Sequence, residues 1–260
     1  MFSAYRSRII IAFLFFSITV SVTQGQRKLI KSEEPSDAAT YYVKGSEDYR
    51  LGRFQQAVDA FKLAVQLKSD YARAYNGIGV ASMDLGLYLD AAEALEQAVR
   101  LAPSMTELYA NLGLVYRHLG RFQEAVKAFQ HAIDLKPDFA AAFSDLGATY
   151  NDLHQYKEAV DALKQAIRLD PGLSAAYNNL GCSYFYLGHY KEALPDYEQA
   201  IRLESGIAAA HFNLGMVQIV LGNKRAALGQ YQTLMRSDTE LAHQLFNQIY
   251  RNKLVAVGAD

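Results

Sequence analysis

Two columns of polar residues recur along the chain with one constant spacing, and both contain groups that could bind a ligand. The first column contains Asp84, His118 and Asp152. Carboxylate and imidazole groups bind metal ions and transfer protons, so three of them in contact would form a metal site or an acid–base centre. No second ligand spacing such as HExxH accompanies them. We therefore expect hydrogen bonds between repeats here, and we predict no catalytic residue, no metal and no cofactor.

The second column consists of amide and carboxyl side chains, at Asn111, Asp145, Asn179 and Asn213. An asparagine side chain can donate and accept a hydrogen bond at once, which suits a ladder that holds the main chain of an extended peptide. The alternative, which we prefer, is that these residues stabilise the packing of neighbouring helices. Both interpretations depend on the repeated element that carries the four residues.

The repeated element is a helix hairpin. Small residues recur with the same constant period as the polar columns. They are Gly45, Gly79, Gly113, Gly147, Gly181 and Gly215, and then Ala57, Ala91, Ala125, Ala159, Ala193 and Ala227. Within residues 106–119 and 122–135 the apolar positions step by three and four, the helical period, and Gly120 and Arg121 form a short turn between them. The small residues are predicted to lie where two helices cross.

Residues typical of caps mark the ends of these helices. A second glycine, such as Gly188, is expected to end the first helix of each hairpin. Asp70, Ser104 and Asp138 stand where an N-cap of the next hairpin would lie. After the sixth hairpin, Ser237–Glu240 has the form of a capping box, which predicts a terminal helix that starts near residue 238 and covers the end of the stack. The pattern predicts thirteen helices.

This pattern resembles the tetratricopeptide repeat family, whose repeats have a period of about 34 residues. The sequence YANLGLVYRHLGRFQEAVKAFQHAIDLKP matches almost throughout, and the resemblance covers about residues 38–241. It implies an all-α, right-handed superhelical solenoid in which the first helix of each unit lines a concave groove. The predicted boundaries are a signal peptide or anchor at 1–25, a linker at 26–37, repeat units at 38–71, 72–105, 106–139, 140–173, 174–207 and 208–241, and the rest of the terminal helix with a tail at 242–260.

The resemblance also implies which residues face the groove. These are Tyr42, Asn76, Arg117, His118, Asn151, Asn178, Phe185, Tyr186, Phe212, Met216 and Ile219. The first four units offer polar and charged residues, whereas the last two offer mostly apolar ones. Contiguous apolar surface usually marks a binding site, and a groove suits a helix or an extended segment. The alternative is that the terminal helix or a second copy of the chain, in a homodimer, covers this patch.

The first 25 residues have the layout of a secretory signal peptide. Arg6 and Arg8 precede an apolar run, Ile9–Val22, and small residues stand before Gln26. The run is shorter than the ~20 residues of a membrane-spanning helix. We expect an exported protein, periplasmic or secreted. The alternative is an uncleaved anchor at residues 9–22, and only then do we expect membrane contact.

Composition and motifs narrow the function to a class. The net charge of −1 argues against a nucleic-acid partner. We find no phosphate loop, nucleophile elbow or zinc spacing. We therefore predict a non-enzymatic scaffold or adaptor that binds a protein or peptide partner. The alternatives are a membrane-tethered assembly factor for a secretion, pilus or envelope complex, and a regulatory subunit of a transferase. The single cysteine, Cys182, is either a buried apolar residue or an exposed thiol.

Overall fold

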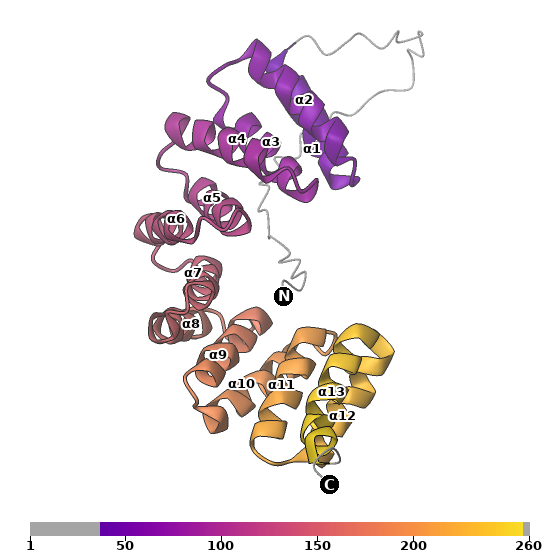
Figure 1. Cartoon of the computed structure of the whole chain (residues 1–260). Helices are drawn as coiled ribbons and strands as arrows, with labels where there is room; N and C mark the ends of the chain where they lie inside the picture. Colours follow the sequence, from indigo (N-terminus) through magenta and orange to yellow (C-terminus); the bar gives the residue numbers. More distant parts are fainter. Residues whose placement is uncertain (1–36, 257–260) are drawn as a thin grey trace, which may run out of the picture. The chain divides into compact units, whose positions relative to one another are not determined.

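A computed structural model describes residues 37–256, and these residues form thirteen α-helices and no strand (Figure 1). The helices are α1 (Ala38–Arg50), α2 (Phe54–Leu67), α3 (Ala72–Asp84), α4 (Tyr88–Leu101), α5 (Thr106–His118), α6 (Phe122–Leu135), α7 (Ala140–Asp152), α8 (Tyr156–Leu169), α9 (Ser174–Tyr186), α10 (Tyr190–Leu203), α11 (Ala208–Val220), α12 (Lys224–Ser237) and α13 (Thr239–Ala256). The predicted fold class, an all-α superhelical solenoid of helix hairpins, is confirmed.

The odd-numbered and even-numbered helices have different neighbours. Each helix packs against the one before and the one after it in the chain. The backbone of each odd-numbered helix also comes close to that of the next odd-numbered helix, whereas no two even-numbered helices have backbones this close within residues 37–256. In a curved stack, the inner row of elements is crowded and the outer row is spread. The odd-numbered helices therefore line the inner face, which is called the groove below.

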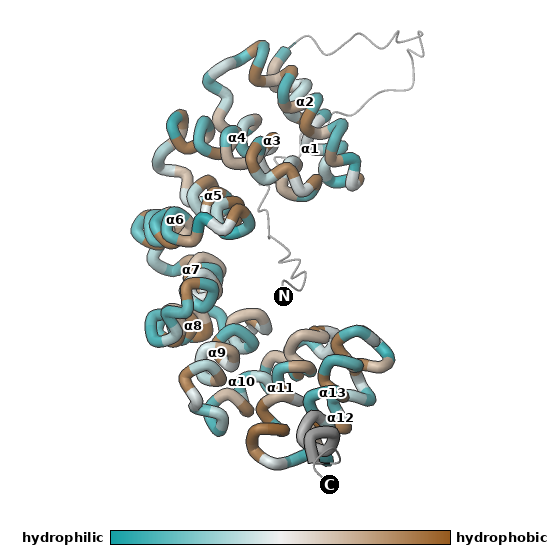
Figure 2. The backbone as a smooth tube through the Cα atoms, viewed as in Figure 1, coloured by the Kyte–Doolittle hydropathy of each residue, from teal (hydrophilic) through white to brown (hydrophobic). Residues whose placement is uncertain are grey.

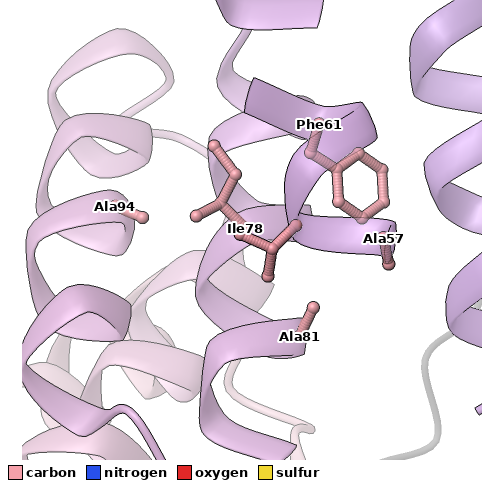
Figure 3. Close-up of a cluster of buried hydrophobic side chains, with 6 residues drawn as sticks. Ala57, Phe61, Ile78, Ala81 and Ala94 are labelled. Carbon is pink, nitrogen blue, oxygen red and sulfur yellow. The ribbon is translucent and has the colours of Figure 1, made fainter. Parts of the chain in front are cut away.

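The core alternates large side chains with glycines, as the repeat pattern predicted. Phe61 of α2 is almost fully buried, and its ring lies in one cluster with Ile78 and Ala81 of α3 (Figure 3). A Cβ atom on Gly45 or on Gly77 would lie 2.8 or 2.7 Å from this ring. Only a residue without a side chain permits this approach. The same contact recurs between Gly79 and Leu95, Gly113 and Phe129, Gly147 and Leu163, and Gly181 and Tyr197.

The starts of the helices differ from the prediction. Asp70, Ser104 and Asp138 are not the N-caps: each cap position is the following residue, such as Tyr71 before α3, whose side chain forms no capping hydrogen bond. Tyr71 instead packs its ring against Tyr42, with centroids 5.2 Å apart. The burial of a large side chain between two hairpins thus takes the place of a capping bond.

The predicted capping box at the last helix is also wrong by one residue. Ser237 ends α12, and Asp238 is the residue that caps α13. The backbone N–H of Leu241 donates to Asp238 Oδ1 over 3.0 Å. Asp238 can accept this bond because it stands three residues before Leu241, which is the spacing of an N-cap and its N3 position.

The terminal helix α13 is built into the last hairpin. It contacts both α11 and α12. A Cβ on Gly215 of α11 would lie 2.6 Å from Leu245 of α13, so Leu245 occupies the place that Phe61 or Leu95 of an even-numbered helix holds in other repeats. The equivalent residue of α12, Tyr231, is only partly buried. The apolar end of the stack is therefore closed by α13.

The predicted signal peptide and nearly all of the linker lie outside the described residues, as does the end of the tail. No helix between residues 37 and 256 is both long and apolar enough to cross a membrane.

Candidate functional site

Polar side chains in the groove are bonded from one odd-numbered helix to the next. The donor and the acceptor stand 35 residues apart in four pairs. These are the Tyr49 hydroxyl to Asp84 (2.7 Å), the Asn111 amide to Asn76 (2.9 Å), the Arg117 guanidinium to Asp152 (2.6 Å) and the Asn213 amide to Asn178 (3.2 Å). Because each pair joins two hairpins, these bonds fix the register of the stack, which is the role we preferred for the asparagine column.

The column of Asp84, His118 and Asp152 does not form a joint centre. The two carboxylates are bonded to Tyr49 and Arg117, while the His118 ring stacks on Tyr88 with centroids 4.6 Å apart and planes 7° apart. Burial and the nearby charge of Arg117 lower the pKa of His118, against the opposing effect of Asp152. In the described part of the chain, no three His, Cys, Asp or Glu residues are placed to hold one metal ion.

The second column divides into bonded and free side chains. Asn111 and Asn213 use their amides in the pairs above. Asp145 and Asn179 have no side-chain hydrogen bond to any part of residues 37–256, because the residues at the corresponding earlier positions are Ala110 and Ser144 rather than asparagine. The free pair lies on neighbouring helices, α7 and α9.

Asp145 is the electrostatically unusual member of this pair. It is partly buried, and burial raises the pKa of its carboxyl from 3.8 to about 6, although the charge of Arg117 acts in the opposite direction. Arg117 is already bonded to Asp152. The groove at α7 therefore contains two carboxyl groups and one guanidinium, and one carboxyl group has no partner.

Asn151 joins α7 to α9 from the groove side. Its amide donates to the backbone carbonyl of Asn179 over 2.9 Å, and its carbonyl oxygen accepts from the Ser183 hydroxyl over 2.7 Å. Asn151 thus has a clear structural role. The bond also fixes the backbone beneath the free Asn179 side chain.

The apolar end of the groove is exposed at two residues. Tyr186 is 63% exposed, although its ring stacks on Tyr156 with centroids 5.0 Å apart. Val220 is 47% exposed, and Figure 2 shows the hydrophobic stretch at the end of α11 to which it belongs. Phe185 packs edge-on against Tyr186 and is partly buried. These residues present an apolar surface at α9 and α11.

The terminal helix covers other apolar residues that the sequence placed in the groove. Phe212, Met216 and Ile219 are partly buried and pack on the cluster that includes Leu245 and Ile249 of α13. Tyr42, at the other end of the groove, packs between Phe61 and Tyr71. The exposed apolar surface is therefore smaller than the list of predicted groove residues suggested.

The surroundings of Cys182 favour the protonated form of its thiol. It is partly buried, it accepts a hydrogen bond from the Asn213 amide over 3.4 Å, and burial raises the pKa of its thiol to about 11. A thiol with this pKa is protonated at neutral pH and is a poor nucleophile.

The sequence interpretation missed the tyrosines that begin two even-numbered helices. Tyr88 of α4 stacks on His118, and Tyr156 of α8 stacks on Tyr186. The spacing from the tyrosine to its partner is the same in both pairs. This shared spacing is visible in the sequence and could have identified the two pairs.

Two hollows lie outside the groove. The larger, about 440 Å³, is lined by residues of α10, α11 and α12, among them His211 and Gln218. The smaller, about 260 Å³, lies between α5 and α6 and is lined by Tyr109, Tyr116 and His131. Neither contains residues of the predicted groove.

Family models decide the identity of the fold. One described as tetratricopeptide repeat matches residues 70–138 and 104–171, another of that description matches 174–206, and one described as TPR repeat matches 45–86. Together these matches cover more than half of the chain. The chain belongs to the tetratricopeptide repeat family.

Solved structures of other proteins are similar to this chain over most of their own length. A crystal structure of MamA is 29% identical, with 62% of this chain and 94% of that chain covered and a TM-score of 0.57. YrrB, described as a TPR protein with an unusual peptide-binding site, is 25% identical, with 67% and 90% covered and a TM-score of 0.57. PilF of Pseudomonas aeruginosa, at 17% identity, 81% and 96% coverage and a TM-score of 0.70, shares the fold. No curated protein sequence matches the chain.

Proposed function

We propose that this chain is a non-enzymatic interaction scaffold that binds a segment of a partner protein along the groove. The observation that carries the proposal is the surface formed by the odd-numbered helices, with free polar side chains at α7 and α9 and exposed apolar ones at Tyr186 and Val220. A groove that offers both kinds of contact suits an extended or helical segment. The similarity to YrrB, whose description names a peptide-binding site, supports the same class of partner.

Site-specific photocrosslinking in the native compartment tests this proposal. A crosslinker at position 220, where the side chain is exposed, should capture a discrete partner, and Tyr186→Asp should abolish the capture. A crosslinker at Lys62, an exposed residue of α2 on the other face, is the matched control. It should not capture the protein that the crosslinker at position 220 captures. Equal capture from both positions would contradict binding in the groove. Crosslinks only to a second copy of the chain would show a homodimer instead.

The place of action is part of the proposal. Export to the periplasm or the medium is supported by the signal-like residues 1–25. Cell fractionation combined with the mass of the mature N-terminus tests it. An intact N-terminus in the membrane fraction would favour the tethered assembly factor, and an intact N-terminus in the cytoplasmic fraction would contradict both versions.

A further inference from the structure

The free side chains of the groove are concentrated at one place. Asparagines on α3, α5, α9 and α11 bond to one another in pairs, so their amides have fewer groups left for a ligand. Asp145 on α7 and Asn179 on α9 have no such partner among residues 37–256. A peptide that needs hydrogen bonds from this column therefore finds them at the centre of the groove rather than along its whole length.

The charges at this place are not balanced. Arg117 donates to Asp152 over 2.6 Å, and this pair is partly buried. Asp145 lies near the same guanidinium without a bond to it. A partly buried carboxylate without a paired cation is unfavourable, and a cation brought by a ligand would remove that penalty.

An apolar contact lies on the next helix of the groove. Asn179, Cys182 and Tyr186 are spaced by three and four residues, so they share one face of α9. Tyr186 stands at the exposed end of that face. Neighbouring helix axes are roughly 8–10 Å apart, and an extended peptide rises ~3.3 Å per residue. Tyr186 also stands seven residues, roughly 10 Å, further along α9 than Asn179, which is the position that corresponds to Asp145 on α7. Asp145 and Tyr186 are therefore roughly 14 Å apart, which an extended peptide spans in about four residues.

We propose that the groove recognises an extended peptide with a lysine or arginine side chain against Asp145 and an apolar side chain, about four residues away, against Tyr186. The Asn179 amide is then free to bond the peptide main chain between these two contacts. The inference rests on the proposed function and specifies the chemistry of its partner. The direction in which the peptide runs is left to the selection experiment below.

Peptide selection on the full chain tests this inference. The probe is a phage-displayed library of random dodecapeptides, selected in parallel on the unchanged chain, on Asp145→Asn, on Asp145→Lys and on Asp134→Asn. The last variant removes a carboxylate from the exposed surface of α6 and is the matched control. Asp145→Asn is expected to fold, because asparagine occupies the same position at Asn111, Asn179 and Asn213, and thermal unfolding followed by circular dichroism checks this.

The expected result is enrichment of Lys or Arg, with an apolar residue about four positions away, on the unchanged chain and on Asp134→Asn. Asp145→Asn should lose the basic preference and bind a selected peptide at least about tenfold more weakly. Asp145→Lys should select Asp or Glu at the same position.

Two other results would overturn the inference. Peptides selected without a basic residue, or with the same basic preference on Asp145→Asn, would exclude recognition by Asp145 while leaving the scaffold function intact. The absence of any selected peptide would exclude the inference as well, and the crosslinking experiment at position 220 then decides separately whether the groove binds a partner at all.

Discussion

Asp145 combines partial burial with an unpaired carboxyl, so it should destabilise the fold in a pH-dependent way. Its pKa is raised from 3.8 to about 6 in the folded chain, so the unfolded chain releases this proton at lower pH. The folded chain tolerates the protonated carboxyl better than the ionised one. The stability that protonation of Asp145 gives is therefore fully present below about pH 4 and is lost as the pH rises through about 6. We predict that Asp145→Asn increases the free energy of unfolding by about 1–3 kcal/mol at pH 7.5, and by less at pH 4.5.

Urea unfolding at the two pH values measures this difference. Asp134→Asn, on the exposed surface of α6, should leave the free energy of unfolding unchanged at both. An equal effect of Asp145→Asn at pH 4.5 and pH 7.5 would show that its carboxyl titrates normally. If Asp145→Asn has a higher free energy of unfolding at pH 7.5 and also binds the peptide more weakly, the free carboxyl contributes to binding while it lowers the stability of the fold.

Cys182 should be protected from alkylation in the native state. Burial raises its thiol pKa to about 11, two units above the ordinary value of 9.0, which lowers the thiolate fraction about a hundredfold. We predict that iodoacetamide modifies Cys182 at least tenfold more slowly in the folded chain than in 6 M guanidinium at pH 8, on the order set by that fraction. Mass spectrometry over time measures both rates, and similar rates would mean that the thiol is open to solvent.

Among the elements, the turn between α7 and α8 carries the only non-glycine residue with positive φ within residues 37–256. His154 has φ 59°, whereas the turns inside the other five hairpins place glycine at the same position with φ between 72° and 80°. A residue with a side chain is strained in this conformation by about 1–2 kcal/mol. His154 gains back part of this through a 2.8 Å bond to the Tyr156 hydroxyl.

We predict that His154→Gly raises the free energy of unfolding by about 0.5–1 kcal/mol, because the relief of strain exceeds the loss of one exposed hydrogen bond. Chemical denaturation measures the change. Gln155→Gly is the control, since Gln155 has an ordinary φ of −91° and should gain nothing from glycine. A similar gain in both variants would attribute the effect to something other than the left-handed turn.

The sequence predicted the helices better than their caps. The constant period and the glycines were enough to predict thirteen helices, because each small residue must face a specific large one, as Gly45 faces Phe61. The N-caps failed because Asp70 and Tyr71 compete for the same turn, and propensity favours the first while burial favours the second. That burial depends on the neighbouring hairpin, which a local cap rule does not consider.

At the scale of the whole molecule, the sequence predicts which residues lie along the groove, but it does not predict which of them are free to bind a partner. The repeat pattern identifies which positions lie on the odd-numbered helices. It cannot show that Asn111 is bonded to Asn76 while Asp145 is free. The bonding partner stands 35 residues earlier, and this offset depends on how far one hairpin is displaced against the next. The sequence also left open whether the terminal helix covers the apolar groove residues, and the structure answers this through the packing of Phe212 and Met216 on the cluster that contains Leu245 of α13.

Stability should be local in this stack, because each hairpin contacts only its neighbours. Leu163 of α8 and Leu245 of α13 are both fully buried, and each packs where a Cβ on a glycine, Gly147 or Gly215, would clash. Replacing either leucine by alanine removes similar contacts and should cost about 2–5 kcal/mol. We predict that Leu245→Ala unfolds only the C-terminal end, whereas Leu163→Ala weakens the middle of the stack and lowers the stability of the whole chain.

Native-state hydrogen exchange distinguishes these outcomes residue by residue. In Leu245→Ala, amide protection should fall in α11, α12 and α13 and stay nearly unchanged from α1 to α6. In Leu163→Ala, it should fall on both sides of α8. An equal loss of protection everywhere in Leu245→Ala would mean that the stack unfolds as one cooperative unit. The exposed apolar contacts of the groove at α9 and α11 would then depend on the closing helix α13 as much as on their own hairpins.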